Sequence, residues 1–184
     1  MIYRTILADP PWPQQMSNAY LKTKQHRPTS LPYPTLTVDQ IKAMPVGELA
    51  ETGCHLWLWV TNRFLRDGFD VIDAWGFKFL APITWVKQSG IGNYFIHRTE
   101  HLLFGYKGKC QFNAARYVPN VYHWPQNTPG NHSRKPPGSY ELIESISDER
   151  RLELFARQSR PGWHVWGNEV RSDVRLKIAR ARAA

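Results

Sequence analysis

The sequence predicts an α/β protein in which one central sheet lies between two layers of helices. Three observations lead to this prediction. Short runs rich in β-branched and aromatic residues, typical of strands, recur along the 184 residues. Segments with apolar residues at helical spacing separate several of these runs. The strand-like runs are also continuously apolar, which is typical of strands that are buried on both faces of a sheet.

The amino-terminal part of the chain contains four predicted strands and two predicted helices. Thr37 is a good N-cap residue for the first helix, because its side-chain oxygen can accept a backbone N–H of the first turn. Gly76 is expected to end the second helix, since glycine readily adopts the left-handed conformation found just past helix ends. We expect strands at 3–8, 55–61, 79–86 and 101–106, and helices at 38–42 and 63–75.

The carboxyl-terminal part continues this pattern. A helix should begin at Pro136, with an apolar stripe formed by Tyr140, Leu142, Ile143 and Ile146. Two further strands are expected at 152–156 and 163–166, followed by a basic helix over 169–184. The segments 13–36 and 109–134 are rich in proline and are interpreted as long functional loops.

Composition indicates one globular domain, residues 1–184, with a polyanionic partner. The 24 Lys and Arg exceed the 15 Asp and Glu, so the formal net charge is +9, which favours nucleic acid as the partner. A basic but inert surface would give the same charge. Two cysteines are too few for a disulfide framework, and no paired Cys/His spacing suggests a metal. Without a signal peptide or a long apolar run, we expect a cytoplasmic protein that does not enter a membrane.

The stretch from Asp9 to Trp12, which we call the acidic proline corner, has the clearest chemistry. It follows the first predicted strand, and ligands of open α/β sheets bind at the carboxyl ends of strands. Pro10 and Pro11 stop the strand, because each fixes its φ angle and neither can donate a backbone hydrogen bond. A carboxylate, a rigid carbonyl-bearing bend and an indole ring are therefore presented together.

These groups suit an exocyclic amine on an aromatic base as the substrate. The Asp9 carboxylate and the Pro10 carbonyl can each accept one N–H, which localises the nitrogen lone pair for attack on an electrophile. A bend that is already rigid before the substrate binds supplies orientation and electrostatic preorganisation. Trp12 could then stack on a base taken out of its helix. On these four residues alone, a solvent-exposed turn is the favoured interpretation, and only the downstream sequence changes the balance.

The order of motifs along the chain resembles the MT-A70-like family, the DPPW-type methyltransferases that use S-adenosylmethionine to modify the N6 amine of adenine. The resemblance runs from Ala8 to about Val170. Its pieces are Ala8-Asp9-Pro10-Pro11-Trp12, Leu31-Pro32-Tyr33, Leu58-Trp59-Val60-Thr61, Ile83-Thr84-Trp85-Val86-Lys87, Thr99-Glu100-His101, Gly105-Tyr106-Lys107-Gly108, Ser133-Arg134-Lys135-Pro136, Glu153-Leu154-Phe155-Ala156-Arg157 and Trp163 with Gly167-Asn168-Glu169.

The resemblance implies a Rossmann-like methyltransferase sheet that is permuted, with the catalytic half before the cofactor-binding half. It also implies roles for individual residues. Asp9, Pro10, Pro11 and Trp12 would form the catalytic corner, and Asp9 and Pro11 would also border S-adenosylmethionine. The remaining cofactor-binding residues would be Lys135 at the methionine carboxylate, Phe155 and Arg157 beyond their strand, and Asn168 and Glu169 at the ribose hydroxyls.

For the acceptor base, the resemblance implies a second group of residues: Tyr33, Trp85, Lys87, His97 and Glu100. Trp85 could equally be a core residue, and His97 could be a solvated loop residue. The chain begins eight residues before Asp9, whereas larger members of the family carry an upstream segment that helps to hold the cofactor adenine. Gln158 and Ser159 also differ from the residues that contact the cofactor at these positions in the family's mRNA adenosine methyltransferase. The residues around the cofactor adenine are therefore not identified.

The sequence therefore predicts S-adenosylmethionine-dependent methyl transfer to the N6 amine of adenine, by direct attack and without a metal. We expect DNA to be the substrate, because the chain has no appended RNA-binding module; RNA is the alternative. A catalytically silent nucleic-acid-binding subunit is a further alternative, although the corner is intact. The target sequence, a partner subunit and a homodimer are left open.

Overall fold

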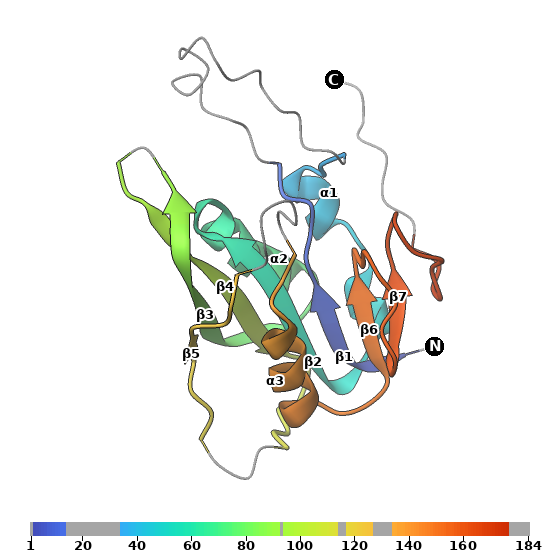
Figure 1. Ribbon diagram of the computed structural model, residues 1–184. Helices are drawn as coiled ribbons and strands as arrows, with labels where there is room; N and C mark the ends of the chain where they lie inside the picture. Colours follow the sequence, from blue (N-terminus) through green and yellow to red (C-terminus); the bar gives the residue numbers. More distant parts are fainter. Residues whose placement is uncertain (1, 14–33, 93, 114–116, 127–133, 177–184) are drawn as a thin grey trace.

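A computed structural model describes residues 2–13, 34–92, 94–113, 117–126 and 134–176, and shows one mixed sheet with helices on both faces (Figure 1). Seven strands form the sheet in the order β5-β3-β4-β2-β1-β6-β7. The central strand β1, Tyr3–Ala8, pairs in parallel with β2, Ala50–Thr61, and with β6, Arg151–Leu154. This arrangement confirms the predicted α/β class with a Rossmann-like sheet.

The strand β4, His97–Tyr106, runs against the other strands. It pairs antiparallel with β2 on one side and with β3, Lys78–Ile91, on the other. The short strand β5, Val121–Tyr122, adds in parallel to β3, and β7, Trp163–Trp166, adds in parallel to β6. The carboxyl ends of all strands except β4 consequently lie at one edge of the sheet.

In the described ranges, helices cover both faces of the sheet, as Figure 1 shows. Helices α1, Val38–Lys42, and α2, Leu65–Ala74, pack on one face, and α3, Pro137–Ile146, packs on the other. Short 3-10 helices at Val46–Leu49 and Asn62–Phe64 adjoin β2. None of the helices in the described ranges is both long enough and apolar enough to cross a membrane.

Side chains of β2 alternate between the two cores. Leu56, Leu58 and Val60 face α1 and α2, whereas Trp57 and Trp59 face α3. Because both faces are covered, the strand is apolar at each position from Leu56 to Val60. This confirms the two-sided burial expected from its sequence. The core therefore has two layers, one on each side of the sheet.

The predicted N-cap of α1 is confirmed. The Thr37 hydroxyl accepts the Gln40 backbone N–H at 3.1 Å, and the Gln40 side-chain oxygen accepts the Thr37 N–H at 2.9 Å. This reciprocal pair is a capping box, which satisfies two amide groups that the helix itself leaves without partners.

Three expectations about connections and ends require correction. The strands β3 and β4 form a hairpin, and β6 reaches β7 without a helix, so strands and helices do not alternate strictly. Residues 121 and 122 form a strand inside the predicted loop 109–134. Residues 169–176 contain turns and bends, not a helix. The remaining expected helical residues, 177–184, and most of the loop 13–36 lie outside the described ranges.

The carboxyl-terminal residues that the structure describes nevertheless pack on the core. Val174 and Leu176 are half-buried against the α1/α2 layer, and the Val165 N–H donates to the Asp173 carboxylate at 2.9 Å. A carboxylate that receives a backbone hydrogen bond beside β7 anchors the chain there. The apolar residues of this tail are thus used without helical periodicity.

Candidate functional site

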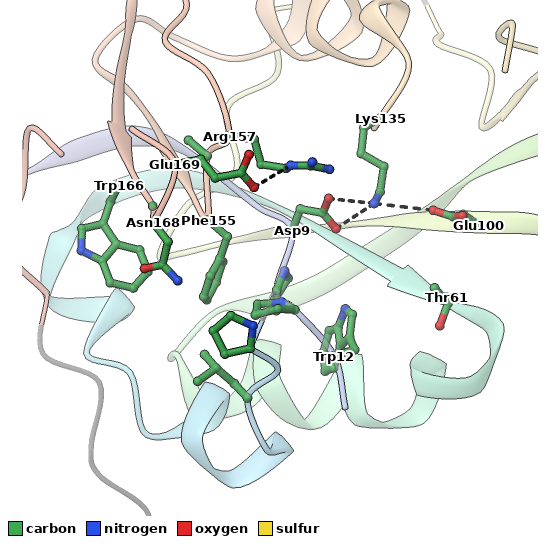
Figure 2. A pocket seen from close by; sticks show the side chains of 16 residues that line it. Asp9, Trp12, Thr61, Glu100, Lys135, Phe155, Arg157, Trp166, Asn168 and Glu169 are labelled. Atoms are coloured by element: carbon green, nitrogen blue, oxygen red, sulfur yellow. Dashed lines mark hydrogen bonds and ion pairs between the residues drawn. The ribbon is translucent and has the colours of Figure 1, made fainter. Parts of the chain in front are cut away.

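A cavity of about 290 Å³ opens at the carboxyl edge of the sheet, where β1, β2, β6 and β7 end (Figure 2). Its size is near the lower end of the ~300–1,000 Å³ range typical of small-molecule sites. Residues from both halves of the chain line it: Asp9, Pro10, Pro11, Trp12, Pro34, Leu36, Thr61, Glu100, Lys135, Phe155, Ala156, Arg157, Trp166, Gly167, Asn168 and Glu169.

Two backbone hydrogen bonds hold the acidic proline corner in shape. The Trp12 N–H donates to the Pro10 carbonyl at 2.8 Å, and the Leu36 N–H donates to the Pro11 carbonyl at 3.0 Å. The sequence suggested a free Pro10 carbonyl oxygen, but in the structure this oxygen already accepts one hydrogen bond. A carbonyl oxygen has two lone pairs, so one further hydrogen bond to a substrate remains available.

Trp12 holds the corner in place and is not a stacking platform. Its ring is 4% exposed, stacks on Phe64 at 5.4 Å between centroids, and donates its indole N–H to the Trp59 carbonyl at 3.0 Å. A buried indole whose N–H is satisfied fixes the backbone that carries it. The expectation that Trp12 stacks on a flipped base is therefore wrong.

Charged side chains form a continuous row from β1 to β3. The Lys135 ammonium, just before α3, contacts both Asp9 oxygens at 2.8 and 2.7 Å and lies 3.7 Å from a Glu100 oxygen. The other Glu100 oxygen accepts from Lys87 at 2.7 Å. Figure 2 shows Lys135 between the two carboxylates. Two acidic groups are thus held side by side by two ammonium groups.

The two carboxyl groups of this row titrate in opposite directions. Burial at the base of the cavity raises the pKa of Asp9, although the Lys135 ammonium opposes this effect. Burial also disfavours the ionised form of Glu100, but Lys135 and Lys87 together hold the pKa of Glu100 below its usual range. Asp9 is consequently the better proton acceptor of the two.

The wall formed by the ends of β6 and β7 has a strained backbone. Phe155 adopts a positive φ of 63°, which is unusual for a residue with a side chain, and its ring meets Trp166 edge-to-face at 5.4 Å. At Gly167 a Cβ atom would overlap the Ala156 carbonyl oxygen and lie 2.8 Å from the Ala156 nitrogen. Glycine is therefore required where the two strand ends approach each other. Such strain is often found at ligand sites.

Polar groups lie at the open rim of this wall. The Arg157 Nε donates to the Glu169 carboxylate at 2.9 Å, and Asn168 lies beside this pair in the cavity lining. All three side chains are exposed at the rim. The rim therefore offers hydrogen-bond donors and acceptors next to an apolar wall of Phe155 and Trp166.

The structure brings together every residue of the expected cofactor-binding group, because Asp9, Pro11, Lys135, Phe155, Arg157, Asn168 and Glu169 all line one cavity. Of the members of the expected acceptor group that the structure describes, only Glu100 lines it.

The other members of the acceptor group lie elsewhere. Trp85 is buried in the core and donates its indole N–H to the Trp124 carbonyl at 2.8 Å. Lys87 acts through Glu100, and His97 is exposed at the start of β4. Tyr33 lies outside the described residues.

Sequence reasoning did not assign roles to several lining residues. Thr61 ends β2 and lies opposite Glu100 in the sheet register, so the rule that sites lie at strand ends could have identified it. Leu36 and Trp166 have only ordinary apolar patterns, and no feature of the sequence indicated their place in the cavity.

Glu153 was also not recognised as an unusual group. It is buried on β6 and accepts the Tyr140 hydroxyl hydrogen at 2.8 Å, whereas its second oxygen has no partner among the described residues. Burial raises the pKa of Glu153 to about 7, and the Asp9 charge adds to this effect, while Tyr140 and Arg160 oppose it.

The amino-acid sequence can also be compared with known proteins. The MT-A70 family model matches residues 3–169, which covers most of the chain and includes all described residues that line the cavity. The chain belongs to the MT-A70 family. MT-A70 proteins are adenine-N6 methyltransferases and in general depend on S-adenosylmethionine. The family resemblance expected from the motifs is thereby confirmed.

MT-A70 relatives of two different lengths are similar to this chain. The N(6)-adenosine-methyltransferase MT-A70-like protein of Arabidopsis thaliana is 31% identical over 95% of this chain and 24% of its own length. The human N(6)-adenosine-methyltransferase catalytic subunit METTL3 is 31% identical over 91% of this chain and 28% of its own length. The chain thus spans about a quarter of these relatives. The Type II methyltransferase M.MunI of Mycoplasma sp is 29% identical over 96% of this chain and 81% of its own length.

Proposed function

We propose that this MT-A70 protein transfers a methyl group from S-adenosylmethionine to the exocyclic N6 amine of adenine in DNA. One observation carries the proposal: the Asp9 carboxylate lies at the base of the cavity, and all residues expected to bind the cofactor line the same cavity. Asp9 lies far from Asn168 and Glu169 in the sequence, so only the fold brings these residues to one cavity. Their meeting there supports a shared role.

The residues of the cavity fit the chemical groups of S-adenosylmethionine. Lys135 offers an ammonium group to a carboxylate, Asp9 offers a carboxylate to an ammonium group, and Asn168 and Glu169 can bond hydroxyl groups. Phe155 and Trp166 supply apolar ring surface. When bound, the cofactor supplies an electrophilic methyl group on a sulfonium.

The acidic proline corner would bind and orient the attacking amine. Asp9 accepts one N–H of the adenine amine, and the remaining lone pair of the Pro10 carbonyl accepts the other. Held in this way, the nitrogen lone pair would be free to form a bond to the cofactor's methyl carbon as the bond from that carbon to the sulfonium sulfur breaks. The nitrogen becomes positively charged and must lose one proton, and the raised pKa of Asp9 suits its carboxylate to accept that proton.

Lys135 competes with the amine for Asp9. In the structure its ammonium contacts both Asp9 oxygens, one of which would accept an N–H of the substrate amine. A cofactor carboxylate would give the ammonium group an alternative partner and would release Asp9. This model couples cofactor binding to the opening of the amine site.

The choice of DNA is supported by M.MunI, a relative that acts on DNA. M.MunI, which this chain covers over most of its length, is named a type II methyltransferase. The much longer relatives are named for adenosine. Those names favour RNA as the alternative substrate, because adenosine is a ribonucleoside.

Mass spectrometry of nucleosides tests the proposal directly. The protein is incubated with S-adenosylmethionine and with double-stranded DNA, single-stranded DNA or RNA, and the nucleosides are then analysed. We expect N6-methyldeoxyadenosine with the wild-type protein and a loss of more than about a hundredfold with Asp9→Asn, because the variant lacks the anionic acceptor.

Lys42→Gln, a half-buried position on α1 that does not line the cavity, is the control. Methylation of RNA alone would replace DNA by RNA in the proposal. If no methylated nucleoside formed, or if Asp9→Asn were fully active, the enzyme would have to be rejected in favour of a silent binding subunit.

A further inference from the structure

We propose that the tip of the β3–β4 hairpin, residues Tyr94–Ile96, is a wedge that enters a nucleic-acid duplex beside the target adenine. In this role it fills the space that the adenine leaves when it turns into the cavity. The inference rests on the proposed function and specifies the form of its substrate, a base-paired duplex.

The hairpin places its tip on the side of the sheet where the cavity opens. Glu100 in β4 lines the cavity, and Ile96 precedes it by four residues, which corresponds to about 13 Å along an extended strand. Figure 1 shows the hairpin extending beyond the sheet at the same edge at which β1 ends. This reach is similar to the ~12 Å width of the DNA major groove, so a duplex that delivers its adenine to Asp9 would lie next to the tip.

The tip exposes apolar and aromatic side chains outside the cavity. Tyr94, Phe95 and Ile96 are 97%, 79% and 61% exposed. Trp12 and Trp85, which the sequence analysis predicted to contact the base, are both buried. Proteins that open a duplex insert side chains of this kind between base steps, and aromatic rings can stack on any base.

The charge of the hairpin matches a polyanion. The sequence contains no Asp or Glu between Asp73 and Glu100, whereas it contains Lys78, Lys87 and Arg98. Arg98 and His97 directly follow the apolar tip and are exposed. Positive charge beside exposed aromatic rings is the combination expected for contact with phosphates and bases.

The backbone holds the tip in a defined shape. β3 and β4 pair up to Ile91 and His97, and the Arg98 Nε donates to the Lys87 carbonyl across the hairpin at 3.0 Å. A Cβ atom at Gly90 would overlap the His97 carbonyl, and one at Gly92 would overlap the Phe95 carbonyl. Both glycines are thus needed for this narrow turn.

A second copy of the chain is a poorer partner for the tip. A two-fold contact between identical tips would bring the Arg98 side chains that flank them close together, and like charges repel at close range. Nucleic acid neutralises the same charges.

The test compares duplex with unpaired DNA of the same sequence. The substrates are a single-stranded circular phage DNA, its double-stranded form, and a double-stranded form in which uracils incorporated opposite adenines have been converted to abasic sites. The proteins are wild type, the double variant Tyr94→Ala/Phe95→Ala, the conservative variant Phe95→Trp, and Tyr117→Ala, which removes a fully exposed aromatic ring outside the hairpin and the cavity lining.

We expect the double variant to lose about tenfold or more in the initial rate on intact duplex. Its rate on single-stranded DNA, and at adenines opposite abasic sites, should stay within about twofold of wild type, because those adenines need no opening. Phe95→Trp and Tyr117→Ala should resemble wild type on every substrate.

Equal losses on all three substrates, or no loss on duplex, would overturn the wedge. A change of oligomeric state in the double variant, measured by sedimentation and accompanied by equal losses, would assign the tip to a contact between copies of the chain. A wild-type protein that methylates no DNA or RNA would overturn the proposed function itself, and the wedge with it.

Discussion

At the scale of single residues, the state of Asp9 depends on two opposing effects. Burial favours its neutral form, and the Lys135 ammonium at 2.7 Å favours its charged form. The substrate amine needs the charged form of Asp9. A carboxylate only accepts hydrogen bonds, whereas a protonated carboxyl group carries an O–H donor of its own. The pH range of activity should therefore be governed by the contact between these two side chains.

Replacing Lys135 by Met should move the acid side of the pH–rate profile. Loss of the ammonium group removes the main effect that opposes burial, so the pKa of Asp9 rises further. The pH at which kcat/KM falls on acidification should then increase by about one unit or more. Initial rates between pH 5 and 9 measure this shift.

Lys87→Met is the control for that experiment. Lys87 contacts Glu100 and is not in contact with Asp9, so the acid side of the profile should move less in this variant. If both variants gave the same profile, Lys135 would not control the ionisation of Asp9.

Glu153 should make the stability of the protein depend on pH. Its carboxyl ionises in the unfolded chain near the ordinary value of 4.5 but in the folded protein only near 7. Below pH 4.5 both states are protonated. As the pH rises towards 7, the unfolded chain ionises first, and the folded state loses stability relative to it. Above 7 this loss is complete.

Glu153→Gln cannot ionise and should avoid this loss. Relative to wild type, the variant should gain on the order of 2 kcal/mol in the free energy of unfolding between pH 4.5 and pH 8. Urea unfolding at both pH values measures the difference. Glu144→Gln, on α3 and outside the cavity, is the control. A difference that does not change with pH would contradict the raised pKa of Glu153.

At the scale of secondary structure elements, the local pattern was a good guide wherever an element is defined by its own residues. The strand Tyr3–Ala8, the capping box of α1 and the apolar stripe of α3 were all confirmed. β4 begins four residues earlier than expected, at His97, because pairing with β3 extends the strand into a polar stretch. The expected tail helix fails over residues 169–176, where contacts with β7 replace helical hydrogen bonds.

Removing the capping box should destabilise the protein measurably. Thr37→Ala leaves the Gln40 N–H without its side-chain acceptor and should lower the free energy of unfolding by about 1 kcal/mol. Chemical denaturation measures the change. Thr35→Ala, at an exposed position two residues earlier, should have no comparable effect. Equal effects of the two substitutions would mean that the capping contact contributes nothing.

At the scale of the whole molecule, the net charge of +9 should determine how tightly nucleic acid binds. Binding that releases counterions from phosphates weakens steeply with salt. The affinity for double-stranded DNA should fall by about tenfold or more between 50 and 200 mM salt, measured by fluorescence anisotropy. A flat response would show that the basic surface does not contact phosphates.

Some features of the site could be predicted from the amino-acid sequence, and others could not. Motif order placed Asp9, Lys135 and Glu169 in one family pattern, and the structure shows that these residues line one cavity. Motif order did not reveal that Lys135 contacts Asp9, a pair separated by 126 positions. It also gave no sign that Trp12 is buried or that the Pro10 carbonyl already has a donor.

The amino-acid sequence by itself determined the fold class, most strands and helices, the rigid corner and the family. These properties depend on the order of neighbouring residues, on proline and glycine geometry and on hydrophobic spacing. Only the tertiary structure decided which groups meet in the cavity, which side chains are free to bind a ligand, and that the apolar hairpin tip lies on the side where the cavity opens. Each of these depends on burial and on contacts between distant segments, which no local pattern records.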